Sequence, residues 1–407
     1  LPVRIQKEFL ERGLQVLRLP EGKAFHREEG VVLELDPDLR VTLDLRPQIE
    51  AARSDMNQEV AGRTSGEDHA GRLKELVPLL DWEHIYFDLL EFKRTRGFYN
   101  LSFTPLSLRR ILEHGYYTVF CPTEQLSLSA FTELRRVHEI AKGVLRKYAA
   151  AFYDRRRRAW GKEQLRLQTL MESDPNLSFG GYTLRVKRDF VEHVRELVER
   201  ADELYTRDMK NFPNIHFDRH LYQPLLVADE KERLESVPPG LNEGERKFVD
   251  DLRKYVQQNG ELLRDKEVFL LRNLTRGKGI GFFETGTGEA FYPDFILWVI
   301  ENAKQWITFI DPHGLRYAKG GFNDSKIRLH ADLKALELTL QQQCTQWQVY
   351  LSSFILSTSR YDEIKKIFPE QYSQEEFEKH NILFIYDDSD YIRKLLRTVL
   401  EDADSKA

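Results

Sequence analysis

From Pro238-Pro239-Gly240 onward the sequence alternates helical and strand-like segments, and this alternation constrains the fold more than any other feature. Two prolines followed by a glycine cannot continue a helix, so we expect a boundary there and a separate domain over residues 236–407. The alternation predicts an α/β domain. Its expected helices cover Asn242–Gln258, Ile327–Gln342 and Tyr391–Leu400, and its expected strands cover Glu267–Leu274, Phe291–Ile300, Trp306–Ile310, Gln348–Leu356 and Ile382–Ile385.

Residues 1–80 read as a small mixed α/β segment. An amphipathic helix is expected around Ile5–Leu14. Apolar and polar residues alternate over Val31–Leu35 and again over Val41–Leu45, which predicts a pair of strands. The polar stretch Ala51–Gly71 has few apolar anchors and is expected to be a loop.

Residues 81–235 form a mainly helical region in this interpretation. Apolar residues recur at helical spacing over Phe131–Trp160, and a second long helix is expected over Asp189–Met209. The first helix carries four consecutive arginines, Arg155, Arg156, Arg157 and Arg158. Such a run is most often a solvated helix face, and contact with DNA phosphates is the sharper alternative.

Composition excludes several classes of protein. Cys121 and Cys344 are the only cysteines, which excludes a cysteine-rich zinc site and fits a reducing cytoplasm. No apolar run approaches the roughly 20 residues that span a bilayer, so no membrane segment is expected. A phosphate-binding loop of the G-x-x-x-x-G-K-[S/T] type is missing, so the chain alone should not hydrolyse ATP. Because the sequence starts with Leu1 instead of Met, a processed chain or a fragment is expected.

Two aspartates mark the expected chemistry. Asp294 follows Pro293 near the start of one strand, and Asp311 ends the next, so a hairpin would bring them side by side. His313 lies two residues after Asp311, and the period of two in a strand predicts that both side chains share a face. Two carboxylates at a strand end suit Mg²⁺, which takes one or two carboxylates together with water and phosphate oxygens.

The helix over Asn242–Gln258 adds a third acid. Glu245 shares a helical stripe with Phe248, Val249 and Leu252, which places its carboxylate on the face that should be buried. Burial of a carboxylate costs roughly several kcal/mol unless it is paired or metal-bound. Glu245 is therefore expected to have a partner, whereas a partly exposed helix carboxylate is the plain alternative.

The acid-bearing helix, the segment Phe291-Tyr-Pro-Asp-Phe295 and the segment Phe309-Ile-Asp-Pro-His-Gly314 together resemble the PD-(D/E)XK nuclease fold. The wider sequence resembles the part of Type III restriction-enzyme-like helicase–nuclease subunits that follows the helicase motor. Arg109–Gly115 and Lys147–Trp160 resemble the helical region between motor and nuclease there.

This resemblance implies a metal-dependent endonuclease that cleaves double-stranded DNA with Mg²⁺, or with Mn²⁺. Asp294, Asp311 and Glu245 would then be metal ligands or would orient water. The family usually has Lys at the position of His313, and a neutral imidazole there can orient water or ligate a metal, better Mn²⁺ than Mg²⁺. Lys304, Lys319 and Lys326 are nearby cations that can replace it if one reaches the site.

The resemblance also implies partners: a helicase motor that is missing from this chain, and a methyltransferase subunit that supplies DNA specificity. Two other interpretations remain open. His313 and the arginine run favour a catalytically inactive nuclease fold that binds DNA or docks a subunit. Alternatively, the helical middle region couples a motor to its partner subunit.

The chain contains another Pro-Asp dipeptide at Pro37-Asp38. Its spacing to Asp44 is too short for the nuclease pattern, so an ordinary turn is expected there.

Overall fold

The computed structural model forms two compact units. Unit 1 comprises Leu1–Pro20, Gln164–Glu284 and Glu289–Ala407, and unit 2 comprises Glu21–Glu163 and Thr285–Gly288. The structure describes residues 1–404 apart from 19, 21–22, 46–66, 123–125, 129–132, 178, 211, 230–232, 259–260, 275–281, 284–289, 314, 316–321, 323–324, 345, 367 and 369–371.

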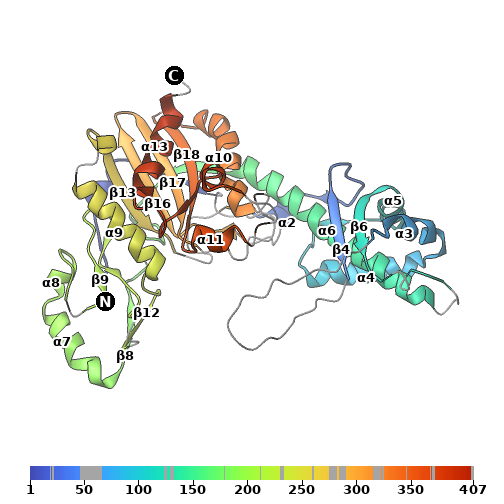
Figure 1. The fold of residues 1–407 in the computed structure, drawn as a ribbon, viewed down its shortest axis with the longest axis horizontal. Coiled ribbons are helices and arrows are strands. Elements are labelled where there is room, and N and C mark those ends of the chain that lie inside the picture. Colours follow the sequence, from blue (N-terminus) through green and yellow to red (C-terminus); the bar gives the residue numbers. More distant parts are fainter. Residues whose placement is uncertain are drawn as a thin grey trace. The chain divides into compact units, whose positions relative to one another are not determined.

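A mixed sheet of five strands forms the centre of unit 1 (Figure 1). The two pairs at the β13 end are antiparallel and the two at the β19 end are parallel. Six of the seven residues of β16 are buried, because helices and other segments cover both faces of this inner strand. In spatial order the strands are β13 (Glu267–Arg272), β16 (Phe295–Glu301), β17 (Lys304–Asp311), β18 (Gln348–Ser357) and β19 (Ile382–Phe384).

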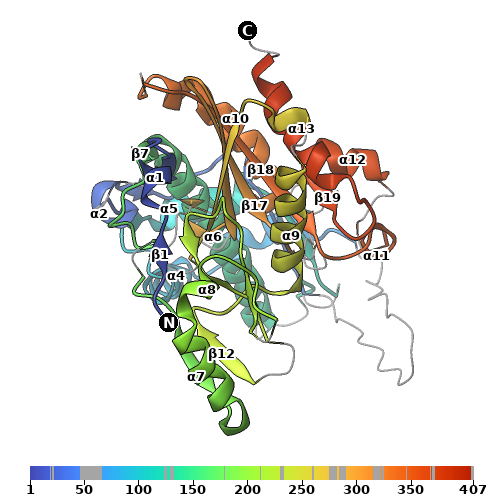
Figure 2. The same ribbon diagram turned by 90° about the vertical axis from the view of Figure 1, so that its left-hand side faces the viewer.

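Helices flank this sheet. Figure 2 shows α9 and α13 on one side of it, where they contact each other. The ring of Phe248 on α9 packs 5.2 Å from that of Phe295 on β16, so the apolar stripe of α9 faces the sheet. α10 contacts β18 extensively. The helices are α9 (Glu243–Gln257), α10 (Ser325–Gln341), α11 (Tyr361–Ile364), α12 (Gln374–Lys379) and α13 (Tyr391–Asp404).

The helix and strand order predicted for residues 242–400 is confirmed, and so is the mixed α/β class. The expected hairpin is the β16–β17 turn, where Asn302 adopts a positive φ of 54°. Between β13 and β16 lies a short antiparallel pair, β14 (Phe282–Phe283) and β15 (Ala290–Phe291). The remainder of that glycine-rich connection, residues 275–281 and 284–289, lies outside the described residues.

Residues 1–20 belong to unit 1 through β2, which pairs with β7. The backbone N–H of Gln15 donates to Oε1 of Gln305 (2.5 Å), and the indole of Trp298 donates to the Gln15 carbonyl (2.7 Å). These buried hydrogen bonds hold β2 against the central sheet. The units therefore divide the chain at 20/21 and 163/164, whereas the sequence boundaries were placed at 80/81 and 235/236.

The rest of unit 1 consists of short elements, so the mainly helical character expected up to residue 235 ends at Gln164. The expected helix around Ile5–Leu14 is only one turn long. The strands are β1 (Arg4–Ile5), β2 (Gln15–Arg18), β7 (Arg166–Thr169), β8 (Thr183–Val186), β9 (Asn214–Ile215), β10 (Tyr222–Gln223), β11 (Leu225–Leu226) and β12 (Leu234–Val237); the helices are α1 (Lys7–Leu10), α7 (Val191–Glu199) and α8 (Ala201–Leu204), with 3₁₀ turns at Arg188–Phe190 and Glu261–Leu263.

Unit 2 is built around the long helix α6. The prediction that the strands at Val31–Leu35 and Val41–Leu45 pair with each other is wrong. β3 and β4 do not pair with each other: β3 runs parallel to β5, and β4 runs parallel to β6. Alternation identifies a strand without selecting its partner, which here lies beyond a helical connection. The elements are α2 (Phe25–Glu28), β3 (Val31–Val32), β4 (Arg40–Asp44), α3 (Ala70–Leu76), a 3₁₀ turn (Val77–Leu79), α4 (Trp82–Thr95), β5 (Leu101–Ser102), α5 (Pro105–His114), β6 (Tyr116–Phe120) and α6 (Leu134–Gln164).

Two sequence expectations for this part of the chain concern loops and membrane segments. Most of the polar stretch at 51–71 lies outside the described residues, which resume at Glu67. Across the described parts of both units, no helix combines the length and the apolar composition needed to cross a bilayer.

Candidate metal centre

Asp294 and Asp311 face each other at one end of the central sheet. The register of β16 and β17 pairs Phe295 with Ile310, so the next position outward places Asp294 opposite Asp311. The N–H of Asn273 donates to the Asp294 carbonyl (2.8 Å), which continues the pairing with β13. Cβ atoms at facing positions lie about 4.5–5.5 Å apart. The sheet therefore brings the two carboxylates together, as the sequence predicted.

Burial and the neighbouring carboxylate change the protonation of Asp294. Burial, repulsion from Asp311 and a hydrogen bond with it, and the charge of Glu245 together raise the pKa of Asp294 to about 9, although Arg272 acts in the opposite direction. Asp311 is itself buried. At neutral pH the pair therefore holds a proton in the absence of a cation. A divalent cation would remove this repulsion and displace the proton.

Glu245 is buried on α9, as predicted, and the structure gives its carboxylate partners. Its Oε2 accepts a hydrogen bond from the N–H of Asn242 (2.7 Å), while the N–H of Glu245 donates to the Asn242 side chain (2.9 Å). This reciprocal capping box begins the helix and fixes the carboxylate. Oε2 also lies 3.5 Å from a guanidinium nitrogen of Arg272. The cost of burying Glu245 is offset by these contacts.

Arg272, at the end of β13, is a member of the site that the sequence analysis missed. Only 11% of its side chain is exposed, and it donates to the Pro239 carbonyl (2.5 Å) as well as approaching Glu245. Burial lowers the pKa of Arg272, but the surrounding acids and tyrosines raise it by more, so the pKa is raised overall. Glu245 has the largest effect among these neighbours. A charged residue that directly follows the apolar run Val268–Leu271 was the signal that could have identified it.

A buried histidine, His220, accepts a hydrogen bond from the backbone of Arg272. His220 is fully buried, and its Nε2 accepts a hydrogen bond from the backbone N–H of Arg272 (2.8 Å). Its Nδ1 therefore carries the proton and donates to the Tyr222 carbonyl (2.6 Å). Burial lowers the pKa of His220 to about 3, so the ring stays neutral at physiological pH. His220 thus has a structural role in holding the end of β13.

Lys326 is the cation that reaches the aspartate pair from the other side. Its Nζ lies 3.4 Å from Oδ2 of Asp311, and it stands in the first turn of α10. Lys304 is the first residue of β17 and lies roughly 23 Å from Asp311 at 3.3 Å per residue, so its side chain cannot reach the aspartate pair. Lys319 lies outside the described residues. Of the three lysines considered from the sequence, the structure brings Lys326 to the acids.

His313 continues the backbone of β17 but has an exposed side chain. Its N–H donates to the Leu356 carbonyl (3.1 Å), and its carbonyl accepts from the N–H of Thr358 (3.4 Å). These bonds extend the parallel register past Pro312, which has no N–H to donate. The alternation that places His313 on the same face as Asp311 is therefore retained, although no polar contact of the ring is seen among the described residues.

The donor set fits a cation that needs few protein ligands. Arg272 and Glu245 meet on the face that α9 covers, whereas Asp311 reaches Lys326 of α10. Consequently no group of three or more His, Cys, Asp or Glu side chains is arranged to hold a metal, as far as the described residues extend. Asp294 and Asp311 form a desolvated pair of oxygen ligands instead. Mg²⁺ is bound in proteins by one or two carboxylates, with water and phosphate completing its shell.

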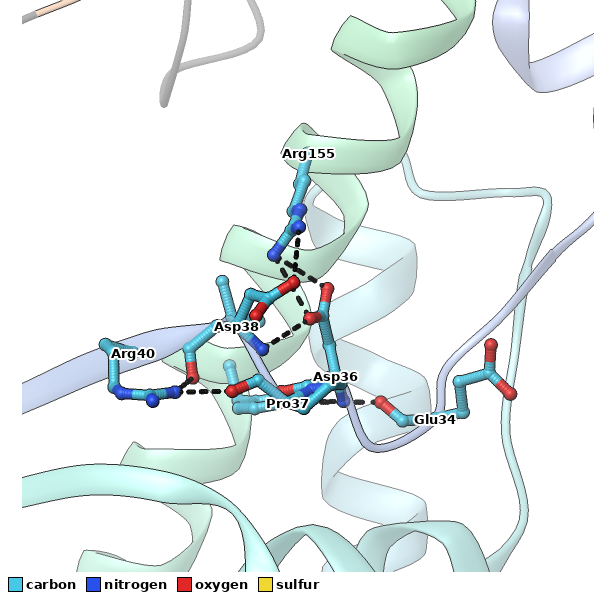
Figure 3. A network of polar contacts seen from close by, with 8 residues as sticks. Glu34, Asp36, Pro37, Asp38, Arg40 and Arg155 are labelled. Atoms are coloured by element: carbon cyan, nitrogen blue, oxygen red, sulfur yellow. Dashed lines mark hydrogen bonds and ion pairs between the residues drawn. The ribbon is translucent and has the colours of Figure 1, made fainter.

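The four arginines for which DNA contact was the alternative to a solvated helix face lie in unit 2 on α6, and several of them have protein partners. Arg155 pairs with Asp36 (3.0 Å) and Asp38 (3.4 Å), as Figure 3 shows. The N–H of Asp38 donates to the Asp36 carboxylate (2.9 Å), so Pro37-Asp38 is a turn, as predicted.

The other three arginines make shorter-range contacts along α6. Arg157 lies 3.5 Å from the Asp154 carboxylate, and Nε of Arg158 donates to the Asp154 carbonyl (3.3 Å). The guanidinium of Arg156 lies 6.0 Å from the centre of the Phe152 ring. The run therefore does not present four unpaired guanidinium groups, and DNA binding by it stays a prediction.

Comparison of the chain with known protein families, with curated proteins and with solved structures finds no match. The assignment of a function therefore depends on the chemistry of this site and on the sequence motifs.

Asp294→Asn should stabilise unit 1 at alkaline pH in the absence of divalent cations. The folded-state pKa of about 9 lies above the ordinary value of 3.8, so the stability contributed by Asp294 is full below about pH 4. It is lost progressively as the pH rises from about 4 to 9. Asn keeps the shape of the protonated acid without titrating, and because one pKa unit corresponds to about 1.36 kcal/mol, we expect a gain of several kcal/mol, up to about 7, at pH 9.

Urea denaturation in EDTA at pH 5 and pH 9, followed by tryptophan fluorescence, measures this difference. Glu243→Gln is the matched control, because Glu243 is an exposed acid two residues from Glu245 on the same helix. Equal stability of Asp294→Asn and the parent at pH 9 would show that the two aspartates do not repel each other.

Proposed function

We propose that unit 1 is a metal-dependent endonuclease that hydrolyses phosphodiester bonds of double-stranded DNA, with Mg²⁺ or Mn²⁺ held by Asp294 and Asp311. The observation that carries this proposal is the facing pair of desolvated carboxylates at the sheet end, with a cationic side chain on each side. The order of helix, three antiparallel strands, helix and parallel strand supports the resemblance to PD-(D/E)XK nucleases.

The side chains of this chain have distinct tasks in the proposed reaction. Asp294 and Asp311 would hold the cation, which supplies Lewis acidity toward the phosphate and the attacking water. Water adds to phosphorus, one P–O ester bond breaks, and the departing oxygen takes up a proton. Lys326 lies close enough to Asp311 to orient water or to balance the charge that develops on the phosphate oxygens.

Glu245 and Arg272 are positioning residues in this proposal. The contacts of Glu245 with Asn242 and Arg272 both involve the same carboxylate oxygen, Oε2. Glu245 holds Arg272, and Arg272 supplies a fixed positive charge near Asp294. The role of Glu245 as a direct metal ligand, implied by the family resemblance, stays a proposal.

The proposed setting follows the family resemblance as well. The nuclease would act in the cytoplasm as part of a restriction or phage-defence assembly. A helicase motor outside this chain would move the DNA, and a methyltransferase subunit would choose the sequence. The charge of the chain, −5, gives no general attraction for DNA, so such partners would also supply affinity.

Asp294→Asn and Asp311→Asn should each slow the nicking of supercoiled plasmid by roughly 100-fold or more in Mg²⁺. A Lewis acid contributes several kcal/mol to transition-state stabilisation, and each 1.36 kcal/mol is a factor of ten in rate. Glu243→Gln should cut like the parent. Cleavage by either Asn variant at the parent rate would contradict the proposal.

Lys326→Ala should slow nicking by about 10–1000-fold while His313→Ala has a smaller effect, because Lys326 contacts Asp311, whereas the His313 ring has no polar contact among the described residues. Arg328→Ala is the matched control, since Arg328 is an exposed cation two residues further along α10. The same plasmid assay in Mg²⁺ and then in Mn²⁺ gives the rates. A larger loss from His313→Ala than from Lys326→Ala would reverse these roles.

A catalytically inactive nuclease fold that binds DNA or docks a subunit is the second candidate. It is favoured by the exposed His313 and by the pairing of Glu245 with Arg272, which partly neutralises the site without a metal. His313→Lys separates the candidates. If this variant cuts plasmid and the parent does not in either metal, the inactive interpretation holds.

A further inference from the structure

Unit 1 contains a pocket at the end of the sheet opposite the aspartate pair. Its volume is about 530 Å³, and it lies where α9 ends and β13 begins. Val268 of β13 borders this pocket, and Arg272 of the same strand borders the aspartate pair, roughly 13 Å further along. The lining residues are Arg219, Val256, Leu263, Arg264, Asp265, Lys266 and Val268.

The backbone around this pocket is fixed by hydrogen bonds to β13 and its lead-in turn. The carbonyl of Arg219 accepts from the N–H of Leu270 (2.9 Å), and His220 beside it is held by Arg272. The N–H of Lys266 donates to the Leu263 carbonyl (3.1 Å), which closes the turn through Asp265. The turns that carry the cationic side chains are therefore held in place beside β13.

Among the described residues, the unpaired charges of the lining are those of two arginines and of Asp265, which leaves one net positive charge. Lys266 is already paired with Glu301 (2.8 Å), and the neighbouring Glu267 is paired with Arg12 (2.9 Å). Within the described ranges of unit 1, the guanidinium groups of Arg219 and Arg264 make neither an ion pair nor a hydrogen bond. The planar fork of a guanidinium matches a phosphate group with two parallel hydrogen bonds.

Three lining residues are apolar, within a lining that exposes more polar than apolar surface. Leu263 and Val268 are buried, and Val256 is partly buried at the end of α9. Such a surface accepts a flat hydrophobic group, and the volume falls in the range of small-molecule sites, roughly 300–1,000 Å³. Two guanidinium groups beside a small apolar area suit a ligand that joins a phosphate to a ring system.

We propose that this pocket binds a phosphomonoester attached to a nucleoside, either as a free mononucleotide or as the 5′-phosphorylated end of a DNA strand. Arg219 and Arg264 hold the phosphate, and Val256, Leu263 and Val268 contact the nucleoside. The pocket is separate from the aspartate pair, so this inference does not depend on cleavage of DNA by unit 1.

Calorimetric titration of the full chain with AMP and with adenosine tests the proposal. EDTA is present throughout, so that no cation at Asp294 and Asp311 contributes to phosphate binding. We expect saturable binding of AMP and at least about tenfold weaker binding of adenosine, because the charge-assisted bonds to phosphate are the strong ones. The double variant Arg219→Gln/Arg264→Gln should bind AMP at least about tenfold more weakly than the parent.

Arg185→Gln is the matched control, an exposed arginine on β8 away from the pocket, and it should bind AMP like the parent. If the double variant does not fold, as judged by circular dichroism, Arg264→Gln alone replaces it, because Arg264 is exposed. Short DNA strands with a 5′-phosphate or a 5′-hydroxyl then compete with AMP.

Displacement of AMP by the phosphorylated strand alone assigns the pocket to DNA ends, and displacement by neither strand assigns it to free nucleotides. The proposal is overturned if neither AMP nor the phosphorylated strand binds the parent. It is equally overturned if the arginine variants bind these ligands as tightly as the parent does.

Discussion

Repulsion between Asp294 and Asp311 is the constraint on which the rest of the site depends. The register of β16 and β17 forces the two carboxylates to face each other, and burial removes the water that would screen them. A proton, a cationic side chain or a metal ion must compensate. The structure supplies Lys326 beside Asp311 and Arg272 near Asp294, and it raises the pKa of Asp294 so that a proton stays bound. A divalent cation would replace that proton.

Much of this arrangement could be predicted from the sequence, because local patterns determine it. The apolar stripe of α9 placed Glu245 in the interior, and strand patterning placed Asp294 and Asp311 at adjoining strand ends. The partners of these acids could not be predicted. Arg272 reaches Glu245 only because β13 pairs with β16 across a long connection, and Lys326 reaches Asp311 only because α10 starts beside β17. Contacts of this kind depend on tertiary packing rather than on periodicity.

The same limit explains the errors elsewhere in the chain. Alternation identified β3 and β4 as strands but could not show that each has a parallel partner beyond a helix. Residues 1–20 carry no pattern that predicts pairing of β2 with β7 or the buried hydrogen bond from Gln15 to Gln305. The arginine run on α6 was expected to be a solvated helix face or a phosphate contact, and no local pattern indicated that Asp36 and Asp38 would pair with Arg155.

The central claim is that Asp294 and Asp311 together form a cation site, and calorimetric titration with Mn²⁺ tests it most directly. Titration at pH 7.5 in two buffers with different ionisation enthalpies counts the protons released on binding. Because the pKa of Asp294 is about 9, we predict one ion bound per chain and the release of about one proton. Asp311→Asn should abolish this binding. Absence of saturable binding by the parent protein, or unchanged binding by Asp311→Asn, would contradict the claim.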